Sequence, residues 1–122
     1  GNITYQAGTF SIGTSARAIN PILTLTDAAS IAVDLQLGNN FLVSMGGSRT
    51  LAAPSNATAG QTGLIYVVQT AGDNTLSYNT VFKFVSGSVP ILTSTTGATD
   101  MLVYSVRSAS TIDAVMLHDF KR

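Results

Sequence analysis

Catalytic chemistry needs nucleophiles, acids and bases, and this chain offers few groups that could act together. His118 is the single histidine, and Asp119 follows it directly. A serine-type hydrolase needs its histidine to lie between a nucleophile and an orienting carboxylate. Because adjacent residues of a strand point to opposite faces, Asp119 is poorly placed to orient His118. We therefore predict that His118 is a surface residue near the end of the chain.

The carboxylates show no pair whose spacing indicates acid–base catalysis. Glycosidases use two carboxyl groups that flank the scissile bond of a sugar substrate. Here several of the acidic residues stand at turns or strand ends, where Asp commonly bonds to the backbone. We assign structural or solvated roles to all six, which are Asp27, Asp34, Asp73, Asp100, Asp113 and Asp119.

Metal and anion sites have equally weak support. Zinc is disfavoured because the chain has one His and no Cys. Calcium needs clustered oxygen ligands, and Gly72-Asp73-Asn74 supplies two side chains in a loop that is better explained as a tight hairpin. No helix pattern follows Gly46-Gly47-Ser48-Arg49, so a glycine turn explains this run better than an anion site. The sequence predicts no catalytic residue, no metal and no cofactor.

A carbohydrate-binding module would need an exposed aromatic platform or a calcium site. The chain has no Trp, and Tyr66 and Tyr104 stand in the strongest strand patterns, where we expect them in the core. Tyr78 is the residue we would test for sugar stacking. Phe82 and Phe84 share one strand face, which suits the core better than a contact between subunits.

The composition favours a sheet protein and limits the classes of partner. A length of 122 residues fits one domain. Only 10% of residues are charged and Glu is absent, whereas Thr occurs 16 times. Because Glu and Lys favour helix surfaces and Thr favours a pleated surface, this balance predicts strands. The formal net charge of zero argues against a nucleic-acid partner, and no apolar run reaches the ~20 residues of a membrane helix.

Short segments of alternating apolar and polar residues run through the whole chain, separated by turn residues. The clearest alternation covers 29–37, and 64–70 is apolar on both faces, which predicts a central strand. Candidate strand segments are 22–26, 29–37, 41–45, 49–52, 64–70, 75–78, 81–85, 101–107 and 111–118, and briefer pieces lie at 2–6, 9–12 and 90–93.

These segments predict an all-β fold, namely a jelly-roll-like β-sandwich of about nine to eleven short antiparallel strands. The simplest connection is a meander, in which Gly46-Gly47 and the loop 71–74 make tight hairpins. We expect residues 1–30 to be an N-terminal arm or the first strands, with a role in docking. Residues 31–122 would form the sandwich, and the whole would be one compact domain.

An ordered set of short motifs lies between residues 33 and 119. Its pieces are VDLQLGNNFLV at 33–43, GSRTLAAPSNATAGQ at 47–61, IYVVQ at 65–69, NTLSY at 74–78, FKF at 82–84 and DMLVYSV at 100–106. This ordered set resembles a β-rich module that recurs in virion proteins of bacteriophages, including tail fibres, spikes and head-attached appendages or decoration proteins.

The resemblance implies a non-enzymatic structural protein on the particle surface. It also implies a homo-oligomer, with a trimer favoured, in contact with other virion proteins. It supplies no catalytic residue, and we expect neither nucleic-acid binding nor membrane insertion. The alternative is a lectin-like module that binds a carbohydrate or receptor on the host surface.

Overall fold

The computed structural model describes residues 18–122 of the chain. The strands expected at 2–6 and 9–12 lie outside the described residues. The described part consists of strands in two sheets and one short 3-10 turn, η1 (Val85–Gly87). This part of the protein is therefore all-β, as the composition and the alternation predict.

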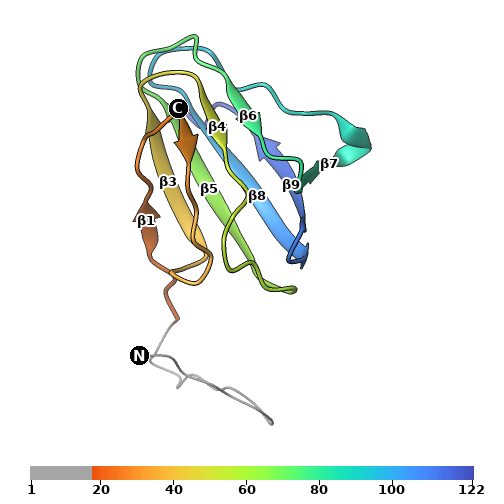
Figure 1. Ribbon diagram of the computed structural model, residues 1–122. Coiled ribbons are helices and arrows are strands. Elements are labelled where there is room, and N and C mark those ends of the chain that lie inside the picture. The colour runs from red at the N-terminus through yellow and green to blue at the C-terminus, as the bar shows by residue number, and fades with distance from the viewer. Residues whose placement is uncertain (1–17) are drawn as a thin grey trace.

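The larger sheet has six strands and the smaller sheet has three. In Figure 1, β4 and β6 cross in front of the larger sheet. The larger sheet has the order β1 (Ile22–Thr24), β3 (Asn40–Met45), β5 (Thr62–Gln69), β8 (Thr99–Ser108), β9 (Thr111–Leu117) and β7 (Phe82–Phe84). The smaller sheet has the order β2 (Ser30–Ile31), β4 (Arg49–Leu51) and β6 (Leu76–Tyr78).

Most strand pairs are parallel, which corrects the antiparallel arrangement that we expected. Only β5–β8 and β8–β9 are antiparallel among the described pairs. From β1 to β6 the chain alternates between the two sheets, so it completes a coil before it returns to the same sheet in the same direction. Parallel neighbours need such a crossover because a tight turn reverses the strand direction. The parallel pairs are β1–β3, β3–β5, β2–β4, β4–β6 and β7–β9.

The glycine turns at 46–47 and 71–74 were wrongly predicted to be hairpins. The first joins β3 to β4 and the second joins β5 to β6, and each of these pairs is split between the two sheets. A tight hairpin does join β8 to β9 after Ser108, where we expected a turn. Turn residues therefore mark where the chain bends, but they do not select the next strand's partner.

Two predicted strands are shorter than expected or missing. Of 29–37, only β2 and an isolated bridge from Asp34 to Ser55 have strand pairing, although Ile31, Val33 and Leu35 are buried as the alternation predicts. Leu37 lies in a turn and is 71% exposed. The segment 90–93 forms no strand. Alternation therefore predicted side-chain burial better than backbone pairing.

Side chains of both sheets meet in one core. Tyr104 is buried, as predicted, and its hydroxyl donates a hydrogen bond to the Asn39 carbonyl at 2.5 Å. Tyr66 was wrongly predicted to be in the core: it is half-buried, because its position in β5 faces away from the smaller sheet. Strand β5 lies between β3 and β8, which confirms its predicted central position. The smaller sheet contributes Ile31, Leu51 and Leu76, and the larger sheet contributes Phe41, Val43, Met45, Ile65, Val67, Phe82, Leu102, Tyr104, Val106, Ile112, Ala114 and Met116.

Candidate functional site

The structure separates the residues that we considered for catalysis. His118 is exposed, as predicted, and its Nε2 lies 2.9 Å from the Ile91 carbonyl oxygen. The neighbouring Asp119 is paired instead with Lys121, with Nζ 2.7 Å from Oδ2. Within residues 18–122, no group of three His or Asp side chains is arranged to hold a metal ion.

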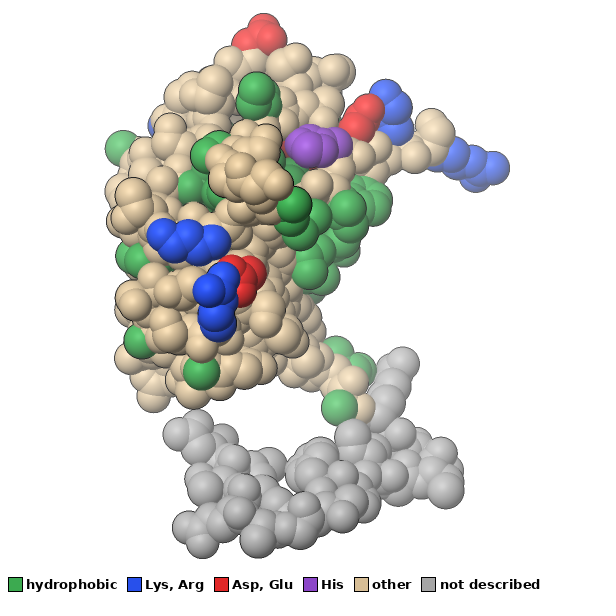
Figure 2. Space-filling view, turned by 90° about the vertical axis from the view of Figure 1, so that its right-hand side faces the viewer, with side chains coloured by type: hydrophobic (Ala, Val, Ile, Leu, Met, Phe, Trp, Pro, Cys, Tyr) green, Lys and Arg blue, Asp and Glu red, His purple; other side chains and the backbone are tan. Residues whose placement is uncertain are grey.

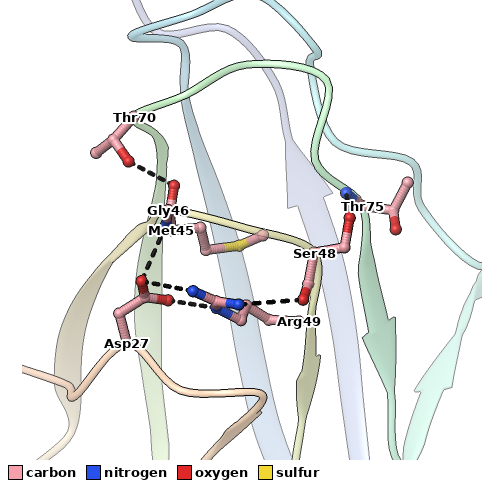
Figure 3. A network of polar contacts seen from close by, with 7 residues as sticks. All are labelled: Asp27, Met45, Gly46, Ser48, Arg49, Thr70 and Thr75. Carbon is pink, nitrogen blue, oxygen red and sulfur yellow. Dashed lines mark hydrogen bonds and ion pairs between the residues drawn. The ribbon is translucent and has the colours of Figure 1, made fainter.

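Asp27 has a structural partner that the sequence did not reveal. Its carboxylate accepts two hydrogen bonds from Arg49, from Nε at 2.7 Å and from Nη2 at 3.0 Å (Figure 3). The Gly46 amide also donates to Asp27 Oδ2 at 3.0 Å. The hydrogen bond from Arg49, followed by that from Gly46, lowers the pKa of Asp27 to about 2. This carboxylate therefore stays ionised and serves the fold.

The other paired carboxylates are also held by hydrogen bonds. Asp34 accepts from Asn56 Nδ2 at 2.8 Å and from the Gln36 amide, and these bonds lower its pKa. Asp113 pairs with Arg107, which lowers the pKa of Asp113 and raises that of Arg107. Neither Asp34 nor Asp113 has the raised pKa that a general acid would need near neutral pH.

Asp100 is the one acidic residue that is fully buried, with 2% of its surface exposed. It accepts hydrogen bonds from the Thr93 amide at 2.8 Å and the Thr93 hydroxyl at 2.9 Å. The Asp119 amide donates to it as well, at 2.8 Å. Asp100 therefore ties the segment before β8 and the segment after β9 to the start of β8.

Tyr78 belongs to an aromatic cluster at the end of the smaller sheet. Its ring meets Phe82 edge-on at 6.1 Å and Phe84 edge-on at 4.8 Å between ring centroids. Burial raises the pKa of the Tyr78 hydroxyl, and no described residue forms a hydrogen bond with it. Phe82 is in the core, as we favoured, and Phe84 packs against it. Tyr78 is thus packed at its edges and does not form an open platform.

The outward side of the larger sheet is the most distinctive surface of the protein. Its side chains alternate with the core residues and lie in two rows across five strands. Four of them expose large apolar surfaces: Ile22 is 54% exposed, Val103 39%, Val115 48% and Leu117 44%. The first row is Ile22, Asn40, Leu64, Val103 and Val115, and the second row is Thr24, Leu42, Tyr66, Met101 and Leu117. We call these ten residues the outer face.

A groove of about 710 Å³ runs over one side of the outer face. Leu64, Val103 and Val115 form its apolar floor, and Phe84 and Val85 line it from β7 and η1. Lys83 and the Arg107–Asp113 pair supply its charges. Figure 2 shows hydrophobic side chains gathered near the single histidine, which follows Leu117 at the end of β9. The groove is therefore mostly apolar, with charges confined to a few positions.

The outward side of the smaller sheet has the opposite character. Ser30, Thr50 and Ser77 lie side by side across β2, β4 and β6, and all three are exposed. A row of hydroxyl side chains is what a sheet face in contact with water requires. The described part of the chain thus has one hydroxyl-lined sheet face and one largely apolar sheet face.

The sequence contained a signal for the outer face that we interpreted differently. Both sides of 64–70 are apolar, which we took as the sign of a central strand. The smaller sheet covers one side, and nothing else within residues 18–122 covers the other. The sequence alone does not show which apolar side of this strand faces the smaller sheet and which faces outward, because this depends on the positions of the two sheets.

A scan of protein-family models, a search of curated proteins and a search of solved structures each found no match to this chain. In the part of the chain that the structure describes, no helix is long and apolar enough to cross a membrane.

Proposed function

We propose that this chain is a non-enzymatic structural module of a bacteriophage particle, as part of a fibre, a spike or a capsid decoration. It works as a subunit of a homo-oligomer, with a trimer favoured, on the particle surface and in contact with other virion proteins. The observation that carries the structural role is the apolar outer face, which contrasts with the hydroxyl row of the smaller sheet.

The size of the outer face suits the centre of a subunit interface. Five strands about 4.8 Å apart span about 24 Å, and two rows of side chains about 7 Å apart cover about 14 Å, which gives about 340 Å². An ordinary interface buries about 800 Å² per partner, with an apolar centre and a polar rim. The outer face would supply such a centre, and Thr62, Ser105 and the Arg107–Asp113 pair would supply part of the rim.

The phage assignment rests on the order of the motifs between residues 33 and 119. A low fraction of charged residues and a surface rich in Ser and Thr are consistent with a rigid particle protein. The two sheets share one core, and this supports their classification as a jelly-roll-like β-sandwich in which parallel coils replace the usual hairpins. The formal net charge of zero supports a role without nucleic-acid binding.

The groove supports the alternative, a module that binds a carbohydrate or receptor on the host surface. Its volume of about 710 Å³ lies in the range of ligand sites. Beside the apolar floor, Lys83 and Arg107 could donate hydrogen bonds to sugar hydroxyls, and Asp113 could accept them. Binding on a broad glycan array that is lost in Lys83→Ala, while the oligomer stays intact, would favour this alternative.

Two experiments test the main proposal. Gold-labelled antibodies against this chain should decorate purified phage particles in electron micrographs, and unlabelled particles would contradict the virion assignment. Light scattering of the purified chain at micromolar concentration should give a multiple of the monomer mass. A clean monomer would contradict the oligomer.

A further inference from the structure

One end of both sheets is open. Strand β1 pairs with β3 and β2 pairs with β4, and within residues 18–122 neither has a neighbour on its other side. Since β1 and β2 are consecutive in the chain, both open edges belong to the same coil. At the other end the larger sheet continues through three more strands, so two copies cannot stack end to end with both sheets continuous.

This open end provides what an additional coil would need. The parallel hydrogen bonding of each sheet continues next to the edge strands. The Leu25 amide, directly after β1, donates to the Leu42 carbonyl at 2.8 Å, and the Ala29 carbonyl, directly before β2, accepts from the Thr50 amide at 3.0 Å. An edge strand presents unpaired backbone groups on its far side, which another strand can bond. Ile22 of the edge strand β1 is 54% exposed, so a coil added beside β1 would also cover apolar surface.

The strands of the smaller sheet share a local pattern. Each places a hydroxyl residue outward and an apolar residue inward, as Ser30-Ile31, Thr50-Leu51 and Ser77-Tyr78 show in register. Ser11-Ile12 repeats this pattern 19 positions before Ser30, and Ser30 itself precedes Thr50 by 20 positions. The residues before β1 therefore contain a candidate for the next strand of the smaller sheet.

The spacing to the larger sheet agrees with this alignment. Ile3-Thr4 precedes Leu23-Thr24 by 20 positions, with the apolar residue inward and the hydroxyl residue outward in β1. The connection from Ile12 to Ile22 would be almost as long as the connection from Ile31 to Asn40, which joins β2 to β3. The β2–β3 connection crosses from the smaller sheet to the larger one, so a connection of this length is sufficient for the crossing.

We propose that the open β1–β2 edge is a strand-addition site and that residues 1–17 of the same chain are its occupant. They add one coil in parallel register, with Ser11 beside Ser30 and Ile12 beside Ile31. The occupant is assigned to the same chain because the connection length fits without a second copy. This inference concerns the end of the sheets and does not depend on the proposed virion role.

Engineered disulfides test the register, and the absence of native cysteine makes the assay free of background. Neighbouring strands lie about 4.8 Å apart, within the ~4.4–6.8 Å between Cα atoms that a disulfide spans. Ser11→Cys with Ser30→Cys should oxidise to an internal disulfide in the monomer. The control, Ser11→Cys with Thr50→Cys, lies one strand further, at about 9.6 Å, and should form at least tenfold less.

Each outcome of the disulfide experiment supports or overturns the proposal. An internal disulfide in the Ser11 and Ser30 pair alone supports the proposal. Equal yields in both pairs overturn the register, and a disulfide-linked dimer overturns the assignment to the same chain. Hydrogen exchange gives a second reading: Ile12→Asp should speed exchange of the β1 and β2 amides at least tenfold and leave β8 and β9 unchanged. Unchanged exchange at β1 and β2 would also overturn the proposal.

Discussion

Asp27 and Arg49 form a two-point ion pair that joins the segment between β1 and β2 to the first residue of β4 (Figure 3). Strands β1, β2 and β4 are only two or three residues long, so their ladders contain few hydrogen bonds. The pair, together with the bond from the Gly46 amide to Asp27, therefore helps to hold one coil in register on the next.

The Asp27–Arg49 pair should contribute to thermal stability. We expect Asp27→Asn to lower the Tm by a few degrees, because the neutral amide cannot satisfy both guanidinium donors. Asp73→Asn is the matched control, since Asp73 is exposed and Asn tolerates its positive φ of 57°. Calorimetry measures both variants, and an equal Tm in the two would contradict a structural role for the pair.

The same carboxylate predicts a dependence of stability on pH. Its pKa is lowered from 3.8 to about 2 in the folded protein, so between these values the unfolded chain binds more protons. The contribution of Asp27 to the free energy of unfolding is therefore complete above pH 3.8 and is lost as the pH falls towards 2. The Tm difference between the wild type and Asp27→Asn should shrink over this window, and a difference that is constant from pH 6 to pH 2 would refute the assignment.

The outer face should control assembly. We expect Val103→Asp to raise the dissociation constant of the oligomer about 100-fold, because an unpaired charge would lie in an apolar interface. Thr50→Asp places the same charge on the hydroxyl row of the smaller sheet and should leave the oligomer intact. Analytical ultracentrifugation measures both, with circular dichroism as the check on folding. Dissociation by both variants, or by neither, would show that the outer face is not the interface.

Removal of the buried carboxylate of Asp100 should be costly. Asp100→Ala leaves the Thr93 amide, the Thr93 hydroxyl and the Asp119 amide without their acceptor. Leaving such donors unpaired should lower the free energy of unfolding by about 3 kcal/mol. Urea denaturation measures this, with the exposed Asp73→Asn as comparison, because Asn tolerates the positive φ of 57° at that position. A loss below about 1 kcal/mol would mean that water replaces the carboxylate.

The hydroxyl of Tyr78 should be dispensable while its ring is not. No described residue bonds this hydroxyl, so Tyr78→Phe should leave the stability unchanged or slightly raise it. Tyr78→Ala removes the edge-on contacts with Phe82 and Phe84 and should lower the free energy of unfolding by about 3 kcal/mol. A clear loss of stability in Tyr78→Phe would reveal a hydrogen bond to this hydroxyl.

Much of the local structure follows from the sequence. Segments predicted at 41–45, 49–52, 64–70, 101–107 and 111–118 correspond closely to β3, β4, β5, β8 and β9. These predictions succeed because the alternation of apolar and polar residues and the turn residues act within a few positions of the chain. The same alternation found the buried side chains of 29–37, even though little of that segment is paired.

The candidate site was harder to predict. Nothing in the local sequence near Asp27 indicates Arg49 as its partner, because the coil between them decides their distance. Likewise the apolar residues of 64–70 predicted a central strand with two apolar sides. Which of these sides the smaller sheet covers, and which stays uncovered within residues 18–122, became visible only when that sheet was placed.

The sequence by itself determined that the chain is a β protein, where most of its strands run and which side chains point into the core. Only the tertiary structure decided that the strands from β1 to β6 alternate between two sheets, that most described pairs are parallel and that one apolar face stays uncovered within residues 18–122. The reason is physical. Side-chain character is set at each position of the chain, whereas the backbone groups that pair strands are alike at almost every residue and do not specify a partner.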